Sequence, residues 1–411
     1  MWVIVLGGSF YLVAKPVREA SIDFYGYYIS ASAIHQGKPI YAQETHDSVS
    51  AAMGIQKASL VRYPPTLAIL IRPLLLVSPY VASLTWFSVN VVLLLIGVGL
   101  LFWQSSLRDG RIRVALLLLP VSFTPVLMNF YLGQVNILIF VLIVLTYLAF
   151  ARRRSYSAGV LLALSTWIKI WPITLIAYFV WKREWKVVAG SLIGLLLIGA
   201  LTLALDGSGQ TTSFFTDQLP RLLDGTERGM DHLNQSIPGV FAKLLAPSSS
   251  YVRPLIENPI LAQQGSRIAT LLAIVATVIL CSWPVALKDR EQFSTEFVLV
   301  VITTMLITGW LWEASLILLL PAYFFIAEEL ERQHITSWRQ IALPIASVVL
   351  IDVHRVIWTL ANPDKQVLPG YLLISPFLGL MLIWLIFVVK RLREIVNSRE
   401  GSHEEVHTLV T

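Results

Sequence analysis

Apolar runs recur along the whole 411-residue chain and constrain its fold more than any other feature. They lie near residues 1–14, 80–103, 113–128, 135–150, 157–168, 170–181, 187–205, 261–287, 296–312, 314–328, 340–361 and 371–389. Apolar residues make up 56% of the chain and charged residues 14%, whereas soluble domains average roughly 45–50% and about 25%. Because a backbone inside a bilayer must satisfy its own hydrogen bonds, these runs predict an all-α polytopic membrane protein with about 12 transmembrane helices.

Basic residues gather in connections between these runs and predict the orientation of the chain. More than half of the 31 Lys and Arg lie in segments 104–113, 151–157, 182–186, 288–295, 328–339 and 390–411. By the positive-inside rule these segments and both termini face the cytoplasm, and the long regions 15–63 and 206–260 face outward. We expect residues 1–389 to form a single integral-membrane domain and residues 390–411 a polar, disordered tail. The net charge of +6 follows from this topology and does not indicate nucleic-acid binding.

Three segments leave the helix count open. Residues 158–181 could form a single helix kinked at Pro172, and the proline-broken segment 64–78 could be a re-entrant half-helix or a span. The run 1–14 is shorter than the roughly 20 residues that cross a bilayer, so the first helix is short or the natural start lies upstream. The lone Cys281 excludes an intrachain disulfide and argues against a zinc site built on cysteine.

The first outer region carries a carboxylate, Asp23, shortly after the first apolar run. An amphipathic helix is predicted there, because aromatic and apolar residues share one helical face: Phe24, Tyr27, Tyr28, Ala31 and Ile34. It should end at Gly37-Lys38-Pro39, and a second short helix is predicted between Thr45 and Lys57, both lying on the membrane surface. Asp23 is either the N-cap of the first helix or a catalytic carboxylate, and its spacing favours neither.

Further polar residues lie at the edges of apolar runs. Arg62 precedes Tyr63-Pro64-Pro65, which is either a turn into the membrane or a place where a guanidinium binds phosphate. Gln134 and Asn136 follow a glycine turn at the outer face, and their amides suit sugar hydroxyls. Lys169 lies inside an apolar run between two tryptophans, where it either snorkels to the interface or binds a ligand.

Other polar residues have simpler explanations. Asn234-Gln235-Ser236 ends a charged stretch typical of a solvated loop, and it also fits an N-glycosylation sequon. Glu313 ends a span at the outer face, and a mutual ion pair is the simplest account of Asp352 and Arg355. The sequence shows no metal-ligand spacing and no phosphate-binding or dinucleotide motif, so we expect neither a metal nor a cofactor.

Taken in order, these motifs resemble glycosyltransferase family 87, which includes polyprenyl-phosphate-mannose-dependent α-1,2-mannosyltransferases. The resemblance covers roughly residues 20 to 325 and rests on Asp23-Phe24, Tyr27-Tyr28, Gly37, Pro39-Ile40-Tyr41, Tyr63-Pro64-Pro65, Gly133-Gln134-Val135-Asn136, Lys169 with Pro172, and Asn234-Gln235-Ser236. Each motif alone is weak, but the ordered set is fairly specific. The chain departs from the family at Ala314-Ser315, because the family often has two histidines after the Trp-acidic pair that stands here as Trp312-Glu313.

The resemblance implies a GT-C-like helical bundle in the cell membrane, with its active site at the outer face. It implies a polyprenyl-phosphate donor of mannose, another hexose or a pentose, and a lipid-linked or cell-wall glycan acceptor, with membrane lipids as further partners. Asp23 would be the general base of an inverting transfer. Donor contacts are expected from Arg62, Tyr63, Gln134, Asn136, Lys169, Asn234, Gln235 and Glu313, and acceptor or lipid contacts from Tyr27, Tyr28 and His35.

This chemistry needs few groups. A sugar phosphate already carries a good leaving group, so the enzyme must supply a base for the acceptor hydroxyl and positive charge for the departing phosphate. Asp23 can be the base, Lys169 or Arg62 can supply the charge, and helices around 64–78 could form the groove for the lipid tail. The alternatives are a lipid or solute transporter and a catalytically inactive membrane scaffold. Against a transporter, no inverted repeat is visible and the polar groups gather at the outer face.

Overall fold

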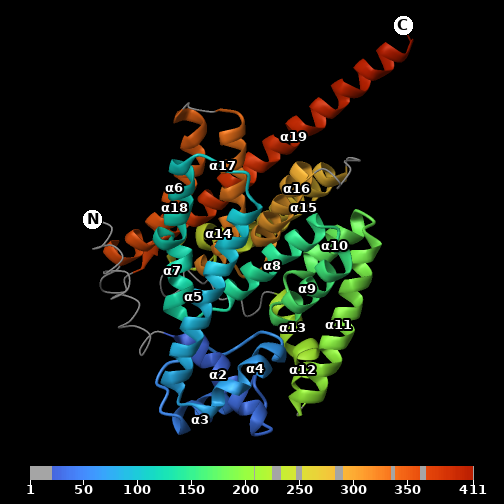
Figure 1. Ribbon diagram of the computed structural model, residues 1–411. Coiled ribbons are helices and arrows are strands. Elements are labelled where there is room, and N and C mark those ends of the chain that lie inside the picture. Colours follow the sequence, from blue (N-terminus) through green and yellow to red (C-terminus); the bar gives the residue numbers. More distant parts are fainter. Residues whose placement is uncertain are drawn as a thin grey trace. The chain divides into compact units, whose positions relative to one another are not determined.

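A computed structural model describes residues 21–207, 209–224, 233–246, 252–282, 290–334, 338–361 and 367–410 (Figure 1). The chain divides into two compact units, each of which we describe by itself. The first unit contains Met1–Gly229 and Glu313–Leu320, and the second contains Met230–Trp312 and Pro321–Thr411. The single domain expected over residues 1–389 therefore stays a prediction.

The first unit is built of helices. Its first described elements are α2 (Ile22–His35), α3 (Gln43–Ala52), α4 (Pro65–Ile71) and the 3-10 helix η2 (Arg72–Leu76). The longer helices are α5 (Pro79–Gln104), α6 (Gly110–Ser122), α7 (Thr124–Leu132), α8 (Asn136–Ala151), α9 (Ser155–Ile168), α10 (Ile173–Trp181) and α11 (Trp185–Asp206). Short helices complete it: α12 (Gln210–Ser213), η3 (Phe214–Gln218), α13 (Leu219–Asp224) and η4 (Glu313–Leu319).

The second unit is also mainly helical. Its helices are α14 (Ile237–Leu245), α15 (Pro259–Ser282), α16 (Arg290–Ile307), α17 (Leu320–Arg332), α18 (Trp338–Ala361), η5 (Gly370–Leu373) and α19 (Ser375–Val410). Two short strands, β1 (Val252–Arg253) and β2 (Leu368–Pro369), pair in parallel and form the only sheet among the described residues. Val252, Leu368 and Leu373 form a small apolar cluster there, so the strand pair ties two loops of this unit together.

Six helices among the described residues are long and apolar enough to cross a membrane. They are Pro79–Gln104, Gly110–Leu132, Trp185–Asp206, Pro259–Ser282, Gln340–Leu360 and Ser375–Ser398. Shorter apolar helices cover Pro65–Leu76, Asn136–Ala151 and Ser155–Ile168. The prediction of a multi-pass helical membrane protein is confirmed at this level. The count of 12 spans stays a prediction, and the run 1–14 lies outside the described residues.

The helices α9 and α10 are separate elements. Helix α9 ends at Ile168, and Lys169 has an extended backbone with φ −150° and ψ 115°. Helix α10 begins only at Ile173, after Pro172. A single helix kinked at Pro172 is therefore excluded, because the chain leaves helical geometry three residues earlier, at Lys169. The break places the lysine in a turn rather than on a continuous helix face.

Small residues let α9 and α11 approach closely, which fixes the helix that ends at this lysine. A Cβ atom added at Gly159 would clash with the carbonyl oxygen of Val187, and one added at Gly190 would clash with that of Tyr156. Backbone contact through small residues is typical of transmembrane helix pairs, in which apolar side chains gain little by leaving lipid. Leu196, on another face of α11, is 72% exposed and suits contact with lipid.

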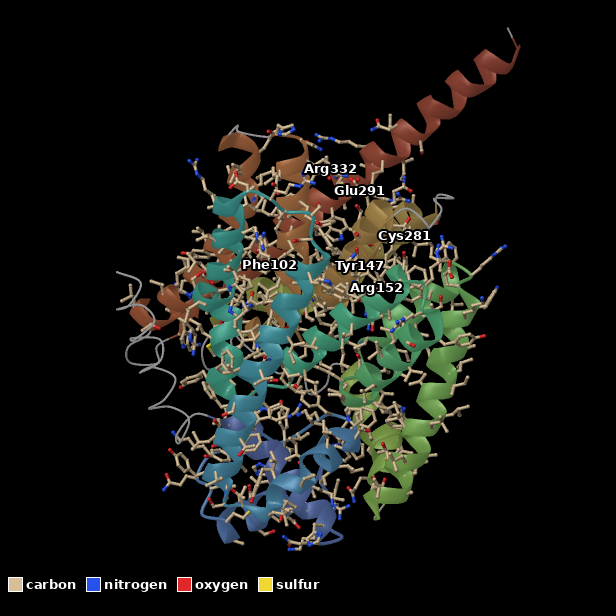
Figure 2. All side chains as sticks on the ribbon, in the orientation of Figure 1. Phe102, Tyr147, Arg152, Cys281, Glu291 and Arg332 are labelled. Carbon is tan, nitrogen blue, oxygen red and sulfur yellow. The ribbon has the colours of Figure 1, made fainter. Side chains whose placement is uncertain are left out.

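Two of the segments assigned to the cytoplasmic side lie together in the first unit. Arg152 after α8 donates a hydrogen bond to Gln104 Oε1 at 2.9 Å, and its guanidinium stacks over the Trp103 ring at 4.0 Å. Arg113 of α6 lies over the ring of Phe102, 5.9 Å from its centre; Figure 2 labels both Phe102 and Arg152. These contacts place segments 104–113 and 151–157 at the same end of this unit, as the positive-inside rule requires.

The last helix, α19, continues through residues that were expected to be disordered. Lys390 pairs with Glu291 at 3.3 Å, and the same carboxylate contacts Arg332 of α17 (Figure 2). Arg391 is fully buried and donates to Glu296 Oε1 at 2.6 Å. Lys390 and Arg391 thus have acidic partners in the second unit, and the disorder expected over residues 390–411 stays a prediction.

Candidate active site

Asp23 lies in the first turn of α2, a helix that is packed on every side. Residues Asp23 to Ile34 are all buried, with α3, α4, η2, α5 and α7 around them. The prediction of a helix with a single buried apolar face is therefore wrong, whereas the expected place of α2 on the membrane surface stays a prediction. The N-cap is Ser21, and no side chain caps the helix. The interpretation of Asp23 as an N-cap is wrong too, and its carboxylate has other partners.

The first partner of this carboxylate comes from the turn between α7 and α8. Gln134 Nε2 donates to Asp23 Oδ2 at 2.5 Å, and Gln134 Oε1 accepts a hydrogen bond from the Tyr27 hydroxyl at 3.1 Å. Gly133 makes the approach possible, because it has a φ of 68° and its added Cβ atom would lie 2.6 Å from that of Phe24. The glycine turn predicted from the sequence therefore also brings an amide to the carboxylate.

Lys169 approaches the same region from the turn after α9. Its Nζ donates to Asn136 Oδ1 at 2.7 Å and lies 5.2 Å from the centre of the Tyr63 ring. The Tyr63 ring lies in turn 6.0 Å from the ring of Tyr27. Six predicted site residues thus meet within the first unit: Asp23, Tyr27, Tyr63, Gln134, Asn136 and Lys169. They provide a carboxylate, a cation, two amides and two phenols for binding a polar, charged ligand.

Burial and hydrogen bonding act in opposite directions on Asp23. Desolvation raises the pKa of its carboxyl group above the ordinary value. Hydrogen bonds from Ser59 and Gln134, together with the positive charge of Lys169, work to lower that pKa. Burial, reinforced by the neighbouring carboxylate, also raises the pKa of the Tyr27 and Tyr63 hydroxyls, so both stay protonated at neutral pH. Burial also lowers the pKa of Lys169 to about 8, against the attraction of Asp23, so the surroundings adjust the protons of both Asp23 and Lys169.

Some predicted contacts lie away from this group. The Tyr28 hydroxyl donates to the Val77 carbonyl oxygen at 2.8 Å, which directs it toward η2. His35 is exposed at the end of α2, and Arg62 is partly buried next to Tyr63 in the chain. The roles of these three side chains in binding an acceptor, a lipid or a phosphate stay predictions.

Asn234 and Gln235 belong to the second unit and hold its backbone. Asn234 Oδ1 accepts from the backbone N–H of Ser236 at 3.1 Å and of Leu311 at 3.0 Å, while its Nδ2 donates to the Gly309 carbonyl oxygen at 2.9 Å. Gln235 Nε2 donates to the Leu373 carbonyl oxygen at 3.2 Å. Asn234 is 4% exposed, so glycosylation of this folded sequon is excluded. The predicted donor contacts of this pair stay untested.

Glu313 begins η4, which packs on α7 and α8 of the first unit. The adjoining Ala314 carbonyl oxygen accepts a hydrogen bond from Asn129 Nδ2 at 2.6 Å, so this asparagine holds the segment that replaces the two histidines of the family pattern. The contacts of Asn129 and Ser59 were not predicted from the sequence. Asn129 stands next to the recognised glycine turn, whereas nothing around Ser59 marks it as a neighbour of Asp23.

An apolar cavity of about 450 Å³ lies within the second unit. Its lining comes from α14, α15, α16 and α19 and includes Val240, Phe241, Ala273, Leu306 and Trp384. Such a cavity suits a hydrocarbon chain rather than a sugar. No group of three or more His, Cys, Asp or Glu side chains that could hold a metal ion occurs among the described residues.

The model of glycosyltransferase family 87 matches residues 61–309, which is more than half of the chain. The chain belongs to glycosyltransferase family 87. The matched region contains Tyr63, Gln134, Asn136 and Lys169, and Asp23 precedes it. This family 87 chain is accordingly a glycosyltransferase by family and a multi-pass membrane protein by its helices.

Curated relatives are distant but cover most of the chain. The polyprenol-phosphate-mannose-dependent alpha-(1-2)-phosphatidylinositol pentamannoside mannosyltransferase of Mycolicibacterium smegmatis is 23% identical over 83% of this chain and 77% of its own length. The corresponding phosphatidylinositol mannoside mannosyltransferase of Mycobacterium tuberculosis is 24% identical over 82% of this chain and 76% of its own length. No solved structure matches the chain.

Proposed function

We propose that this family 87 protein transfers mannose from a polyprenyl-phosphate donor to a lipid-linked or cell-envelope glycan, at the outer face of the membrane and with inversion. The observation that carries the proposal is the buried carboxylate of Asp23, which contacts an amide and shares its surroundings with Lys169. The names of the relatives support the donor, because both depend on polyprenol-phosphate-mannose, and they support a lipid-linked acceptor. Another hexose or a pentose is the second choice of sugar.

In the proposed reaction Asp23 is the general base. An acceptor hydroxyl attacks the anomeric carbon on the face opposite the phosphate, the bond from that carbon to the phosphate oxygen breaks, and the hydroxyl proton passes to the Asp23 carboxylate. Polyprenyl phosphate leaves with the bonding electron pair. Because the hydroxyl attacks from the opposite face, the configuration at this carbon is inverted. The raised pKa of Asp23 strengthens it as a base above the pH at which it ionises.

Lys169 is proposed to stabilise the departing phosphate. Its ammonium is held on Asn136 at 2.7 Å and faces Tyr63, and a fixed cation stabilises charge that develops in the transition state without further reorganisation. Arg62, the residue before Tyr63, is proposed to bind a second phosphate oxygen. The apolar cavity of the second unit is proposed to take a hydrocarbon chain of a lipid-borne substrate.

The proposed topology places both termini in the cytoplasm and the regions 15–63 and 206–260 outside. It is supported by the positive-inside rule and by the close packing of two basic segments around Arg152. In a Cys281→Ser background, a cysteine at Gln43 should react with an impermeant thiol reagent in intact cells. A cysteine at Ser155 should react only after the cells are opened. The reverse pattern would reject the proposed orientation.

The function is tested by incubating the purified protein with a panel of polyprenyl-phosphate sugars and lipid-linked glycan acceptors. We expect polyprenyl-phosphate mannose to be consumed, with a glycosylated acceptor and free polyprenyl phosphate as products. The Asp23→Asn variant is the matched control, since it keeps the size of the side chain but cannot accept the proton. A wild-type protein that consumes no donor would instead favour a transporter or an inactive scaffold.

A further inference from the structure

The side-chain amide of Gln134 is occupied by the protein at both ends. Its Nε2 bonds to Asp23 Oδ2 at 2.5 Å, and its Oε1 bonds to the Tyr27 hydroxyl at 3.1 Å. The residue is 4% exposed, so a sugar hydroxyl could replace these bonds only by leaving a buried group unpaired. We propose that Gln134, oriented by Tyr27, is a positioning residue that holds the Asp23 carboxylate ready to accept a proton. This inference rests on the proposed role of Asp23 as the base.

The direction of the hydrogen bonds supports this role. An ionised carboxylate only accepts hydrogen bonds, whereas an amide has a donating end and an accepting end. Because the Tyr27 hydroxyl donates to Oε1, the amide presents its NH₂ group to Asp23. Rotating the amide by half a turn would place two oxygens against each other and lose the bond. The carboxylate still has acceptor positions for the incoming proton, since its two oxygens offer about four.

The backbone around Gln134 is held as well as its side chain. The Gln134 N–H donates to the Asn129 carbonyl oxygen at 2.9 Å, and Trp86 Nε1 donates to the Gly133 carbonyl oxygen at 2.9 Å. The Trp86 ring stacks on Phe24, the residue after Asp23, at 6.0 Å. Both ends of the Asp23–Gln134 bond are therefore fixed to the same packed cluster, as accurate positioning requires.

The same bond also affects the charge of Asp23. Burial favours the neutral acid and raises its pKa, while the hydrogen bond from Gln134 favours the carboxylate. The charged and titratable groups that act with Asp23 are Lys169, which favours the carboxylate, and the hydroxyls of Tyr27 and Tyr63, which stay neutral because burial raises their pKa. Loss of the Gln134 amide should therefore shift the ionisation of Asp23 to higher pH.

The test is the pH profile of kcat/KM with polyprenyl-phosphate mannose. Gln134→Leu should move the acid limb up by about one pH unit and lower the plateau of kcat, while the KM for the donor stays close to that of the wild type. Tyr27→Phe keeps the ring and should give a smaller shift in the same direction. The double variant should shift no further than Gln134→Leu alone, because Tyr27 acts through the amide.

Matched controls remove the same groups elsewhere. Gln210→Leu deletes a buried amide that accepts from the Ile40 N–H at 2.9 Å, and Tyr323→Phe deletes a buried hydroxyl 2.9 Å from Ser347 Oγ. Neither control should move the acid limb.

Two outcomes separate the inference from the proposed function. A raised donor KM with an unmoved acid limb in both Gln134→Leu and Tyr27→Phe would show that Gln134 binds the sugar, and would overturn the positioning role while leaving Asp23 as the base. An Asp23→Asn variant with full activity would overturn the proposed base, and the role of Gln134 with it. If Gln134→Leu does not fold, the profile of Tyr27→Phe decides the question.

Discussion

Two buried amides, Gln134 in the first unit and Asn234 in the second, were both expected to contact the sugar donor. The structure gives them different hydrogen-bond partners. Gln134 bonds to the ionisable side chains of Asp23 and Tyr27. Asn234 bonds to backbone groups, among them the N–H of Leu311 and the carbonyl oxygen of Gly309. Both residues follow or begin a turn, so their sequence context is alike, and only the fold separates them.

The contrast shows how partners indicate the role of a buried amide. Backbone partners carry no protons that a reaction could use, so an amide that satisfies them stabilises the fold. An amide that bonds to a carboxylate changes the orientation and ionisation of that carboxylate and can affect chemistry. We therefore expect the chemistry to lie in the first unit, and we expect Asn234 to stabilise the backbone of the second unit.

The largest effect is expected at Asp23. Asp23→Asn should lower turnover by about 10²–10⁴, since the amide cannot accept the acceptor proton, and donor binding should be largely kept. Single-turnover rates and donor binding, measured on the same preparation, separate the two effects. Near-native turnover would show that the Asp23 carboxylate is not the base. The first unit would then have no assigned catalytic group, like the second.

Lys169→Met should have the second-largest effect. Methionine keeps an apolar stem of similar length but removes the charge that is held on Asn136. Loss of one group that stabilises developing charge should lower kcat/KM by about 10²-fold, with weaker donor binding. Titration with polyprenyl phosphate alone checks the binding part. Unchanged affinity and turnover would leave Lys169 as an interfacial anchor.

Much of the fold could be predicted from local patterns, whereas the surroundings of α2 could not. The predicted stop at Gly37-Lys38-Pro39 agrees with the end of α2 at His35, because glycine and proline act over a few residues. The aromatic stripe suggested one buried face, but small residues on the other faces, such as Ser30 and Ala33, are buried as well. Whether such a face meets protein or lipid depends on elements distant in sequence.

The candidate site was predicted by resemblance and assembled by the fold. Asp23 and Gln134 are 111 positions apart, and no spacing rule connects them. The ordered motifs of the family include Asp23, Gln134 and Asn234 alike. They do not indicate which of these residues are in contact in the folded protein. The packed start of α19 was missed for the same reason, since the polar run beginning at Lys390 and Arg391 looks disordered unless the buried Glu296 is known to face it.

Asn234→Ala should reduce stability rather than chemistry. It leaves the Leu311 and Ser236 N–H groups without their acceptor in a buried setting, at a cost of about 2–4 kcal/mol. The remaining folded protein should turn over at the wild-type rate per molecule. Thermal unfolding and turnover normalised to folded protein measure the two parts. Asn258→Ala, which removes an exposed hydrogen bond to the Leu261 N–H, is the control and should cost less. A lower turnover per folded molecule in Asn234→Ala would show that Asn234 takes part in the reaction.

The pH dependence of the unfolding free energy should distinguish the role of Asp23 from that of Asn234. The pKa of Asp23 is raised in the folded protein above the ordinary value of about 3.8, so between these two values the folded state keeps a proton that the unfolded chain has lost. Stability contributed by this group is therefore present at low pH and falls as pH rises through that window. Asp23→Asn should be at least as stable as the wild type at neutral pH, with the difference shrinking toward pH 4. A difference independent of pH would contradict the raised pKa.

The smallest effect is expected at the end of α19. Deletion of residues 396–411 should leave folding and turnover unchanged, because the segment is mostly polar and Val396, its first residue, is 52% exposed. Arg391→Met, only a few residues earlier, is the contrast: it breaks the buried ion pair with Glu296 and should cost about 3–5 kcal/mol. Membrane expression and melting temperature of both variants show how far along α19 side-chain packing contributes to stability. Loss of folded protein in the deletion would show that residues from Val396 onward are needed for packing. Equal stability of the two variants would show that the buried Arg391–Glu296 pair does not stabilise the second unit.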